Sequence, residues 1–238
     1  PVRLVLVGLD GHLASAAERA RASLQRQLPG LTLTLHAAAE WHEDPAALER
    51  CRADIAAADL VVVTMLVMEE HVQAVLPALE ARREHCDAMV CCMSAGEIMR
   101  LTRMGRFAMD GSPGGAMALL RRLRGADRQA GQSSGAGQMA MLRRLPRILR
   151  FIPGTAQDVR AYFLTLQYWL AGSEENVANL VRHLIDRYAD GPRAGLRGRM
   201  RPAPPAEYPE VGIYHPRAPG YIQEGADGLP KPPEPCRG

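Results

Sequence analysis

The 238-residue chain has almost no lysine, few aromatic residues and no long apolar run. Lys231 is the only lysine among 29 basic residues, and no G-x-x-x-x-G-K-[ST] motif is present, which excludes an ordinary P-loop. We therefore expect no ATP hydrolysis by this chain. No stretch reaches the roughly 18 consecutive apolar residues of a membrane-spanning helix. The formal net charge of +3 is too small to indicate nucleic-acid binding.

Cysteine is scarce, and its five positions follow no pattern. An odd number without regular spacing does not indicate a disulfide framework, and the lack of Cys-x-x-Cys argues against a zinc site. Because free cysteine is among the most buried residue types, we predict reduced thiols in the core of a cytoplasmic protein. The cysteines are Cys51, Cys86, Cys91, Cys92 and Cys236.

Along the first part of the chain, segments with the apolar spacing of a strand alternate with segments that have the apolar spacing of a helix. Near-continuous apolar runs such as Leu60–Leu66 are typical of buried parallel strands, and Asp44-Pro45 is typical of a helix start. Ser94 and Glu97 together indicate a capping box that begins a helix. Strands are predicted at 2–8, 31–36, 60–66 and 87–93, and helices at 14–28, 45–58, 68–84 and 94–104.

This order of elements predicts an α/β fold: a flavodoxin- or Rossmann-like doubly wound parallel sheet, followed by an α-helical segment and an irregular Pro-rich tail. We expect residues 1–104 to form the doubly wound domain and 105–137 to form a flexible connection with one short helix. A helical segment at 138–190 is expected to pack on the sheet. Residues 191–238 are expected to be a Pro-rich linker at the start of a further domain that this chain lacks.

Ligands of doubly wound sheets usually lie at the carboxyl ends of the strands. Gly8-Leu-Asp-Gly11 follows the first strand but lacks the G-x-G-x-x-G spacing, so it favours a plain turn over a dinucleotide site. Glu69 and His71 follow the third strand, where they could bind a cation or move a proton, or could form a solvated first helical turn. Arg103 and Arg106 could contact carboxylates, phosphates or an acidic partner, or could belong to an ordinary basic face.

Aromatic residues are only 5% of the chain, yet many of them fall between Arg143 and Tyr188. A basic helix, a Pro-Gly turn and two further helices are predicted there, with Thr155 and Ser173 as helix caps. Tyr162 and Trp169 share one helical stripe. Such a stripe is more often core or interface than a cofactor site, although it could stack on a flat ligand.

Five longer motifs are far more specific than these short patterns and span nearly the whole chain. They are CCMSAGE at 91–97, LTRMGRF at 101–107, RFIPGTAQDVRAY at 150–162, QYWLAGSEEN at 167–176 and EYPEVGIYHP at 207–216. Together they resemble the amino-terminal region of the large, porphyrin-binding H subunit of magnesium chelatase, which is related to the cobaltochelatase large subunit.

The resemblance implies a part in (bacterio)chlorophyll synthesis. In that family protoporphyrin IX is held by the large subunit, while two AAA+-type motor subunits use ATP to drive Mg²⁺ insertion, a ligase reaction that forms a nitrogen–metal bond. The family's large subunit is several times longer than 238 residues, and its catalytic carboxylates and histidines lie in later domains. The resemblance therefore implies a non-catalytic amino-terminal piece, natural or truncated. Its partners would be the rest of the large subunit, the motor subunits and protoporphyrin IX.

No catalytic or metal-binding residue of the family can be transferred to this sequence, and no cofactor is assigned to the chain itself. Candidates for contact with porphyrin or with other domains are Glu69, His71, Arg103, Arg106, Tyr162 and Trp169. Two other functions stay open: a stand-alone flavodoxin-like interaction or regulatory module, and a cobaltochelatase-type large-subunit domain. A third alternative is a small enzyme that uses Glu69, Glu70 and His71.

Overall fold

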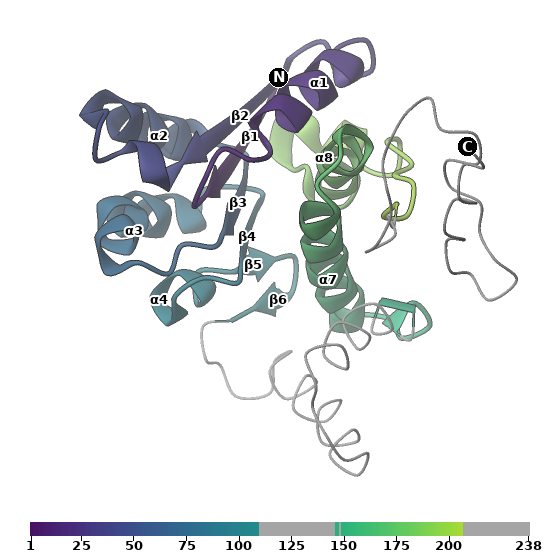
Figure 1. Ribbon diagram of the computed structural model, residues 1–238. Coiled ribbons are helices and arrows are strands. Elements are labelled where there is room, and N and C mark those ends of the chain that lie inside the picture. Colours follow the sequence, from purple (N-terminus) through teal and green to yellow (C-terminus); the bar gives the residue numbers. More distant parts are fainter. Residues whose placement is uncertain (110–145, 148, 207–238) are drawn as a thin grey trace, which may run out of the picture. The chain divides into compact units, whose positions relative to one another are not determined.

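The computed structural model describes residues 1–109, 146–147 and 149–206 of the chain. By their contacts, Pro1–Pro205 form one compact unit. Figure 1 shows a central sheet in this unit with helices on both of its faces. Most of the predicted connection at 105–137, the first part of the predicted segment at 138–190 and the predicted tail beyond residue 206 lie outside the described residues.

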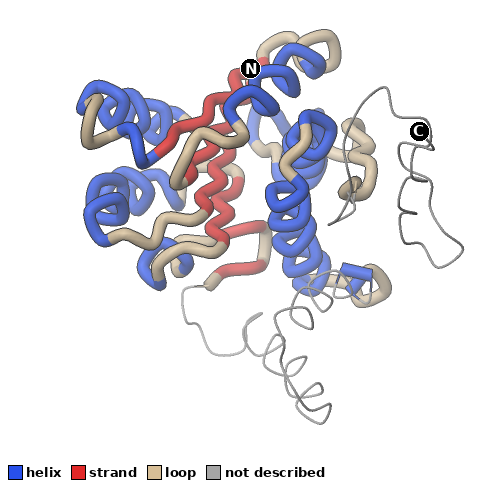
Figure 2. Tube along the Cα trace, viewed as in Figure 1, coloured by secondary structure: helices blue, strands red, loops and turns tan. Residues whose placement is uncertain are grey.

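A six-stranded sheet with strand order β2-β1-β3-β4-β5-β6 forms the middle layer, drawn in red in Figure 2. The strands are β1 (Val2–Gly8), β2 (Leu31–Ala37), β3 (Leu60–Thr64), β4 (Ala88–Cys92), β5 (Arg103–Met104) and β6 (Phe107–Ala108). Strands β1 to β4 pair in parallel, and β5 and β6 add an antiparallel hairpin. The predicted α/β class, with a mainly parallel sheet, is therefore confirmed.

Helices cover both faces of the sheet because its central strands are apolar on both sides. The helices are α1 (Ala14–Leu24), α2 (Pro45–Ala57), α3 (Glu69–Arg83), α4 (Gly96–Met99), α7 (Thr155–Ala171) and α8 (Glu174–Tyr188), with 3₁₀ turns η1 (Ala38–Glu40) and η2 (Gly191–Leu196). Along β1, Leu4 and Leu6 join the core formed with α1, α7 and α8, whereas Val5 and Val7 join the core formed with α2 and α3. None of the helices in the described ranges has both the length and the apolar character needed to cross a membrane.

Short-range sequence signals set several helix ends. The Asp44 side chain accepts a hydrogen bond from the backbone N–H of Ala46 at 3.0 Å, as predicted for the cap of α2. Ser173 caps α8 in the same way, accepting from the N–H of Asn176 at 3.2 Å. The cap assigned to Thr155 is wrong, because Thr155 is already the first residue of α7 and the glycine before it offers no side-chain cap.

The helix predicted at 94–104 is wrong in its extent, since α4 is a single turn and the β5–β6 hairpin follows it. Ser94 does not form a capping box. Its hydroxyl accepts from the N–H of Leu66 at 3.2 Å and donates to the carbonyl of Cys92 at 3.0 Å, so it ties together the loops after β3 and β4. Gly105 turns the hairpin with a φ of +58°, which residues with a Cβ rarely adopt.

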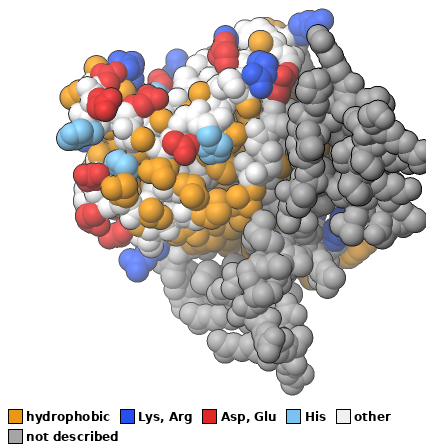
Figure 3. All heavy atoms as spheres, viewed as in Figure 1, with side chains coloured by type: hydrophobic (Ala, Val, Ile, Leu, Met, Phe, Trp, Pro, Cys, Tyr) orange, Lys and Arg blue, Asp and Glu red, His pale blue; other side chains and the backbone are white. Residues whose placement is uncertain are grey.

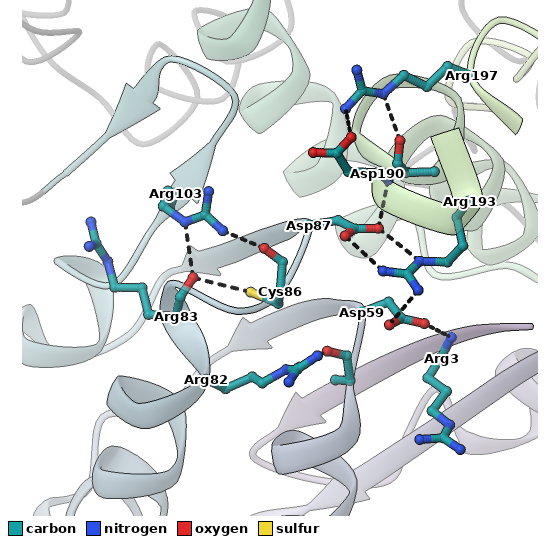
Figure 4. Close-up of polar contacts among 12 residues, drawn as sticks. Arg3, Asp59, Arg82, Arg83, Cys86, Asp87, Arg103, Asp190, Arg193 and Arg197 are labelled. Atoms are coloured by element: carbon teal, nitrogen blue, oxygen red, sulfur yellow. Dashed lines mark hydrogen bonds and ion pairs between the residues drawn. The ribbon is translucent and has the colours of Figure 1, made fainter. Parts of the chain in front are cut away.

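At the amino ends of β3 and β4, one arginine bridges two acids (Figure 4). Arg193 lies 3.2 Å from a carboxylate oxygen of Asp59 and 2.9 Å from one of Asp87. The backbone N–H of Arg3 donates to Asp59 at 2.8 Å, and that of Asp190 donates to Asp87 at 2.9 Å. These contacts hold the segment after α8 against the sheet, so the chain itself occupies the amino edge.

Candidate functional site

The four parallel strands end along the opposite edge of the sheet, which we call the carboxyl edge. It consists of the loops at 9–13, 38–44, 65–68 and 93–95, together with the first turns of α3 and α4. Sheets of this kind usually hold their ligands at this edge.

Trp169 brings α7 onto the carboxyl edge. Its indole lies so close to Gly8, the last residue of β1, that a Cβ at Gly8 would stand 3.4 Å from the indole Cζ2. The ring of His12 meets the indole edge-on, with 6.1 Å between the ring centroids. Because Trp169 is only 4% exposed, it packs the helix against the strand end and leaves little ring surface for a flat ligand.

Glu69, Glu70 and His71 begin α3 at the carboxyl edge. The His71 ring packs edge-on against Trp41, with 5.8 Å between centroids, and its Nε2 lies 3.8 Å from the Glu70 carboxylate. That separation is too long for a hydrogen bond. Nδ1 of His71 and Nε1 of Trp41 are buried, and neither has a hydrogen-bond partner among the described residues. Since buried polar atoms are nearly always paired, this is the most under-satisfied part of the edge.

Two methionines adopt left-handed backbone conformations where neighbouring strands end. The φ angle is +62° at Met65, after β3, and +48° at Met93, after β4. This conformation costs a residue with a Cβ roughly 1–2 kcal/mol, and such strain tends to gather at functional sites. The N–H of Met65 donates to the carbonyl of Cys92 at 3.4 Å, and the N–H of Ala95 donates to that of Leu66 at 2.8 Å. The surrounding hydrogen bonds thus hold both loops in place.

Arg103 and Arg106 lie away from the carboxyl edge. Because β5 runs antiparallel to β4 and pairs with its first residues, Arg103 is placed toward the amino ends of the strands. Its guanidinium donates to two backbone carbonyls where α3 ends and leads into β4 (Figure 4). Arg106 is exposed in the hairpin turn, and its backbone N–H donates to Asp158 at 3.0 Å. The structure therefore separates both arginines from Glu69 and His71.

Tyr162 lies in the core between α7 and β4. Its hydroxyl donates to the carbonyl of Cys91 at 3.1 Å, and its ring meets those of Phe107 and Phe163 edge-on. Burial raises the pKa of the Tyr162 phenol far above its usual range, so the group is a neutral donor that fixes α7 on the sheet. A role for Tyr162 in ligand contact stays a prediction.

Asp158 is the central buried acid that the sequence did not single out. Its carboxylate accepts from the backbone N–H of Arg106 at 3.0 Å, from the hydroxyl of Tyr188 at 2.9 Å and from the guanidinium of Arg187 at 3.3 Å. One carboxylate therefore joins the β5–β6 hairpin, α7 and α8. The available signal was its spacing, because Asp158 stands one helical turn before Tyr162 on the same stripe.

His183 is a buried titratable group of α8. It is 4% exposed, and its ring lies 5.9 Å from that of Tyr168. Burial, reinforced by the positive charges of Arg187 and Arg160, lowers the pKa of His183 to about 3. The imidazole is therefore neutral near pH 7 and belongs to the packing of α7 on α8.

The four described cysteines are free and buried, as predicted, while Cys236 lies outside the described residues. Burial raises the pKa of Cys51 and of Cys92 to about 12, so these thiols are poor nucleophiles. Within the described ranges, no group of three or more His, Cys, Asp or Glu residues could hold a metal ion.

Comparison with known families identifies the family to which the chain belongs. The family model described as "Domain of unknown function (DUF3479)" matches residues 3–163. The chain belongs to the DUF3479 family. A second model, CobN/Magnesium Chelatase, matches residues 166–232. The two matches meet inside α7, yet α7 and α8 share one hydrophobic core with the sheet, so the DUF3479 domain is completed here by helices that extend into the second match.

The chain is also similar over nearly its whole length to proteins named as the H subunit of magnesium chelatase. It is 48% identical over 229 residues to the protein of Cereibacter sphaeroides, which covers 96% of this chain and 19% of that relative. Identity to the protein of Rhodobacter capsulatus is 46% over 232 residues, or 98% of this chain and 19% of the relative. The chloroplastic ChlH protein of magnesium chelatase from Oryza sativa subsp. indica is 28% identical over 223 residues, or 92% of this chain and 16% of the relative.

The chain thus spans 19% or less of the length of these relatives and matches the amino-terminal part of the two bacterial ones. The resemblance expected from the motifs is confirmed. Neither the stand-alone module nor the cobaltochelatase-type domain is favoured by these matches.

Proposed function

We propose that this chain acts as the amino-terminal domain of a magnesium chelatase H subunit. The complete enzyme would use ATP on two AAA+-type motor subunits to insert Mg²⁺ into protoporphyrin IX, a step of (bacterio)chlorophyll biosynthesis that serves photosynthesis. Mg²⁺ and protoporphyrin IX are substrates of that reaction, and the chain is one part of a multisubunit ligase. The observation that carries this proposal is 48% identity over 96% of the chain to a magnesium-chelatase H subunit.

Within that complex we propose a non-catalytic role for the domain. Two of the candidates for porphyrin contact, Tyr162 and Trp169, are 5% and 4% exposed and make core contacts. We therefore derive no step of metal insertion from them. Glu69 and His71 lie at the carboxyl edge, which makes this edge the best-supported surface for contact with the rest of the large subunit or with the motor subunits.

We also propose the finer fold assignment and the cellular location. A flavodoxin-like, doubly wound fold is supported by the parallel order β2-β1-β3-β4 and by helices on both faces. A cytoplasmic location is supported by four buried free thiols.

The test is a domain exchange in the magnesium-chelatase H subunit of Cereibacter sphaeroides. Residues 3–232 of this chain, from the start of the first family match to the end of the second, would replace the corresponding amino-terminal region. Mg²⁺ insertion would be followed by the fluorescence of the metallated porphyrin, with motor subunits and ATP present. We expect activity within about tenfold of the natural protein, equivalent to about 1.4 kcal/mol.

The matched control is a second exchange with an unrelated flavodoxin-like domain, which should give no activity. A folded chimera carrying this chain that fails to insert Mg²⁺ would show that the proposed function is wrong. Equal activity from the unrelated domain would also count against it, because any domain of that shape would then serve.

A further inference from the structure

The carboxyl edge exposes three large apolar side chains in one short loop. We call Met65, Val67 and Met68 the carboxyl-edge patch; these residues are 40%, 59% and 48% exposed. Figure 3 shows hydrophobic side chains gathered on one face of the described region, with acidic and histidine side chains near them. Contiguous apolar surface with a polar rim marks interaction sites in soluble proteins.

The charged side chains within the loops of this edge are acidic. The four loops at 9–13, 38–44, 65–68 and 93–95 contain no Lys or Arg, although the chain has 29 basic residues and a net charge of +3. Exposed acids on the edge are Asp10, Glu40, Glu43, Asp44, Glu69, Glu70 and Glu97, of which Asp44 is paired with Arg50 of α2 at 2.8 Å. Arginines such as Arg103 and Arg193 lie instead at the amino ends of the strands. The carboxyl edge is therefore apolar and acidic in a protein that is basic on average.

The backbone around the patch is held in an unfavourable conformation. Met65 and Met93 keep left-handed φ angles at the ends of the adjacent strands β3 and β4. Hydrogen bonds join the loop after β3 to the loop after β4. The neighbouring His71 and Trp41 keep buried nitrogens that have no partner in the described ranges. Methionine side chains adapt their shape to different partners and are frequent on binding surfaces. These features favour a surface kept for binding over an incidental exposure.

We propose that the carboxyl-edge patch docks a protein segment that is both apolar and basic, namely an amphipathic helix whose polar face carries Arg or Lys. The apolar face of that helix would cover Met65, Val67 and Met68, which gives the interface a dry centre. Its cations would meet Glu69, Glu70 and Glu97 at the rim, where complementary charge sets orientation and specificity. A membrane surface or an anionic ligand does not fit, because the acids of this edge would repel it. The proposal concerns this surface alone and does not depend on the chelatase role.

The test measures binding of a synthetic helical peptide to the 238-residue chain by fluorescence anisotropy. The peptide is about five turns long, with leucines on one face and arginines on the other. A second peptide carries glutamate in place of every arginine. We expect the basic peptide to bind, more weakly as salt shortens the Debye length from about 8 Å toward about 3 Å, and the acidic peptide not to bind.

Variants locate the binding to the patch. The Glu69→Gln/Glu70→Gln double variant and Val67→Ser should each weaken binding about tenfold, or about 1.4 kcal/mol. Glu80→Gln is the matched control because it removes an exposed acid near the other end of α3, and it should leave binding unchanged. All four positions are exposed, so circular dichroism should show unchanged folding for every variant.

Three outcomes would overturn the proposal. One is the absence of binding to the unaltered chain. The second is equal binding by the Glu69→Gln/Glu70→Gln variant or by the acidic peptide. The third is self-association of the chain in sedimentation experiments that Val67→Ser abolishes, since the patch would then be a contact between two copies.

Discussion

Asp158→Ala should destabilise the chain by about 3 kcal/mol, because it removes the acceptor shared by three groups. The Asp158 side chain is 12% exposed, and its carboxylate accepts from the backbone N–H of Arg106, the hydroxyl of Tyr188 and the guanidinium of Arg187. Breaking a buried charged pair costs about 3–5 kcal/mol. The Arg187 side chain is 30% exposed, so water can still reach part of its charge, which places the expected cost at the lower end of that range.

Two further variants separate charge from shape. Asp158→Asn keeps the size of the side chain and one carbonyl acceptor but loses the negative charge, so we expect a cost of about 1–2 kcal/mol. Glu175→Gln is the control, because it neutralises an exposed acid in the first turn of α8. An exposed substitution of this kind should stay within about 0.5 kcal/mol.

The assay is urea and thermal unfolding followed by circular dichroism and tryptophan fluorescence. A loss of about 3 kcal/mol should lower the melting temperature of a domain of this size by about 6–12 °C. If Asp158→Ala unfolds no more easily than the Glu175→Gln control, the Asp158 carboxylate does not hold the hairpin against α7 and α8, and the reasoning fails.

Two further predictions concern Trp169 and His183. Trp169→Ala should lower the free energy of unfolding by about 3–5 kcal/mol, because Trp169 is only 4% exposed. Leu170→Ala is the control: Leu170 is 45% exposed, so its loss should be no more than about 0.5 kcal/mol. Equal losses would contradict the placement of the indole at the end of β1. His183 has a folded pKa lowered to about 3 by burial and by nearby arginines, below its usual value of 6.5, so the unfolded chain takes up the proton first as pH falls. Its contribution to stability is present above pH 6.5 and is lost toward pH 3, by roughly 3 kcal/mol at pH 4. In His183→Met the free energy of unfolding should depend less on pH across this window, and an unchanged profile would mean that His183 is not neutral in the fold.

Much of the sheet could be read from the sequence because its strands are short apolar runs separated by strong helix signals. The run at 60–66 contains β3, and Asp44 followed by proline marks the start of α2. The β5–β6 hairpin could not be read in this way. Two-residue strands are too short to leave a periodic pattern in the sequence. The arginines around residue 103 have a helix-like spacing, so the sequence favours a continued helix, whereas α4 ends before them.

The site was predictable where it depends on strand order and unpredictable where it depends on distant pairing. Glu69 and His71 were expected at the carboxyl end of a strand because they follow β3 directly in the sequence, and they lie there. The bridge from Arg193 to Asp59 and Asp87 joins residues more than a hundred positions apart, so only the folded chain reveals it.

The boundary between the two family matches falls inside α7. The segments that the family models describe therefore do not coincide with the segment that folds as one unit. A chain ended at Phe163 would keep the docking of Tyr162 on β4 but would lose Trp169 and all of α8. The side chains of Leu4 and Leu6 would then lose part of their cover, because some of it comes from beyond that point. Exchange of either family segment between relatives should therefore carry α7 and α8 as one piece. Because buried residues of α8 share one core with the sheet, a substitution on that face of α8 is expected to perturb the packing of the DUF3479 domain.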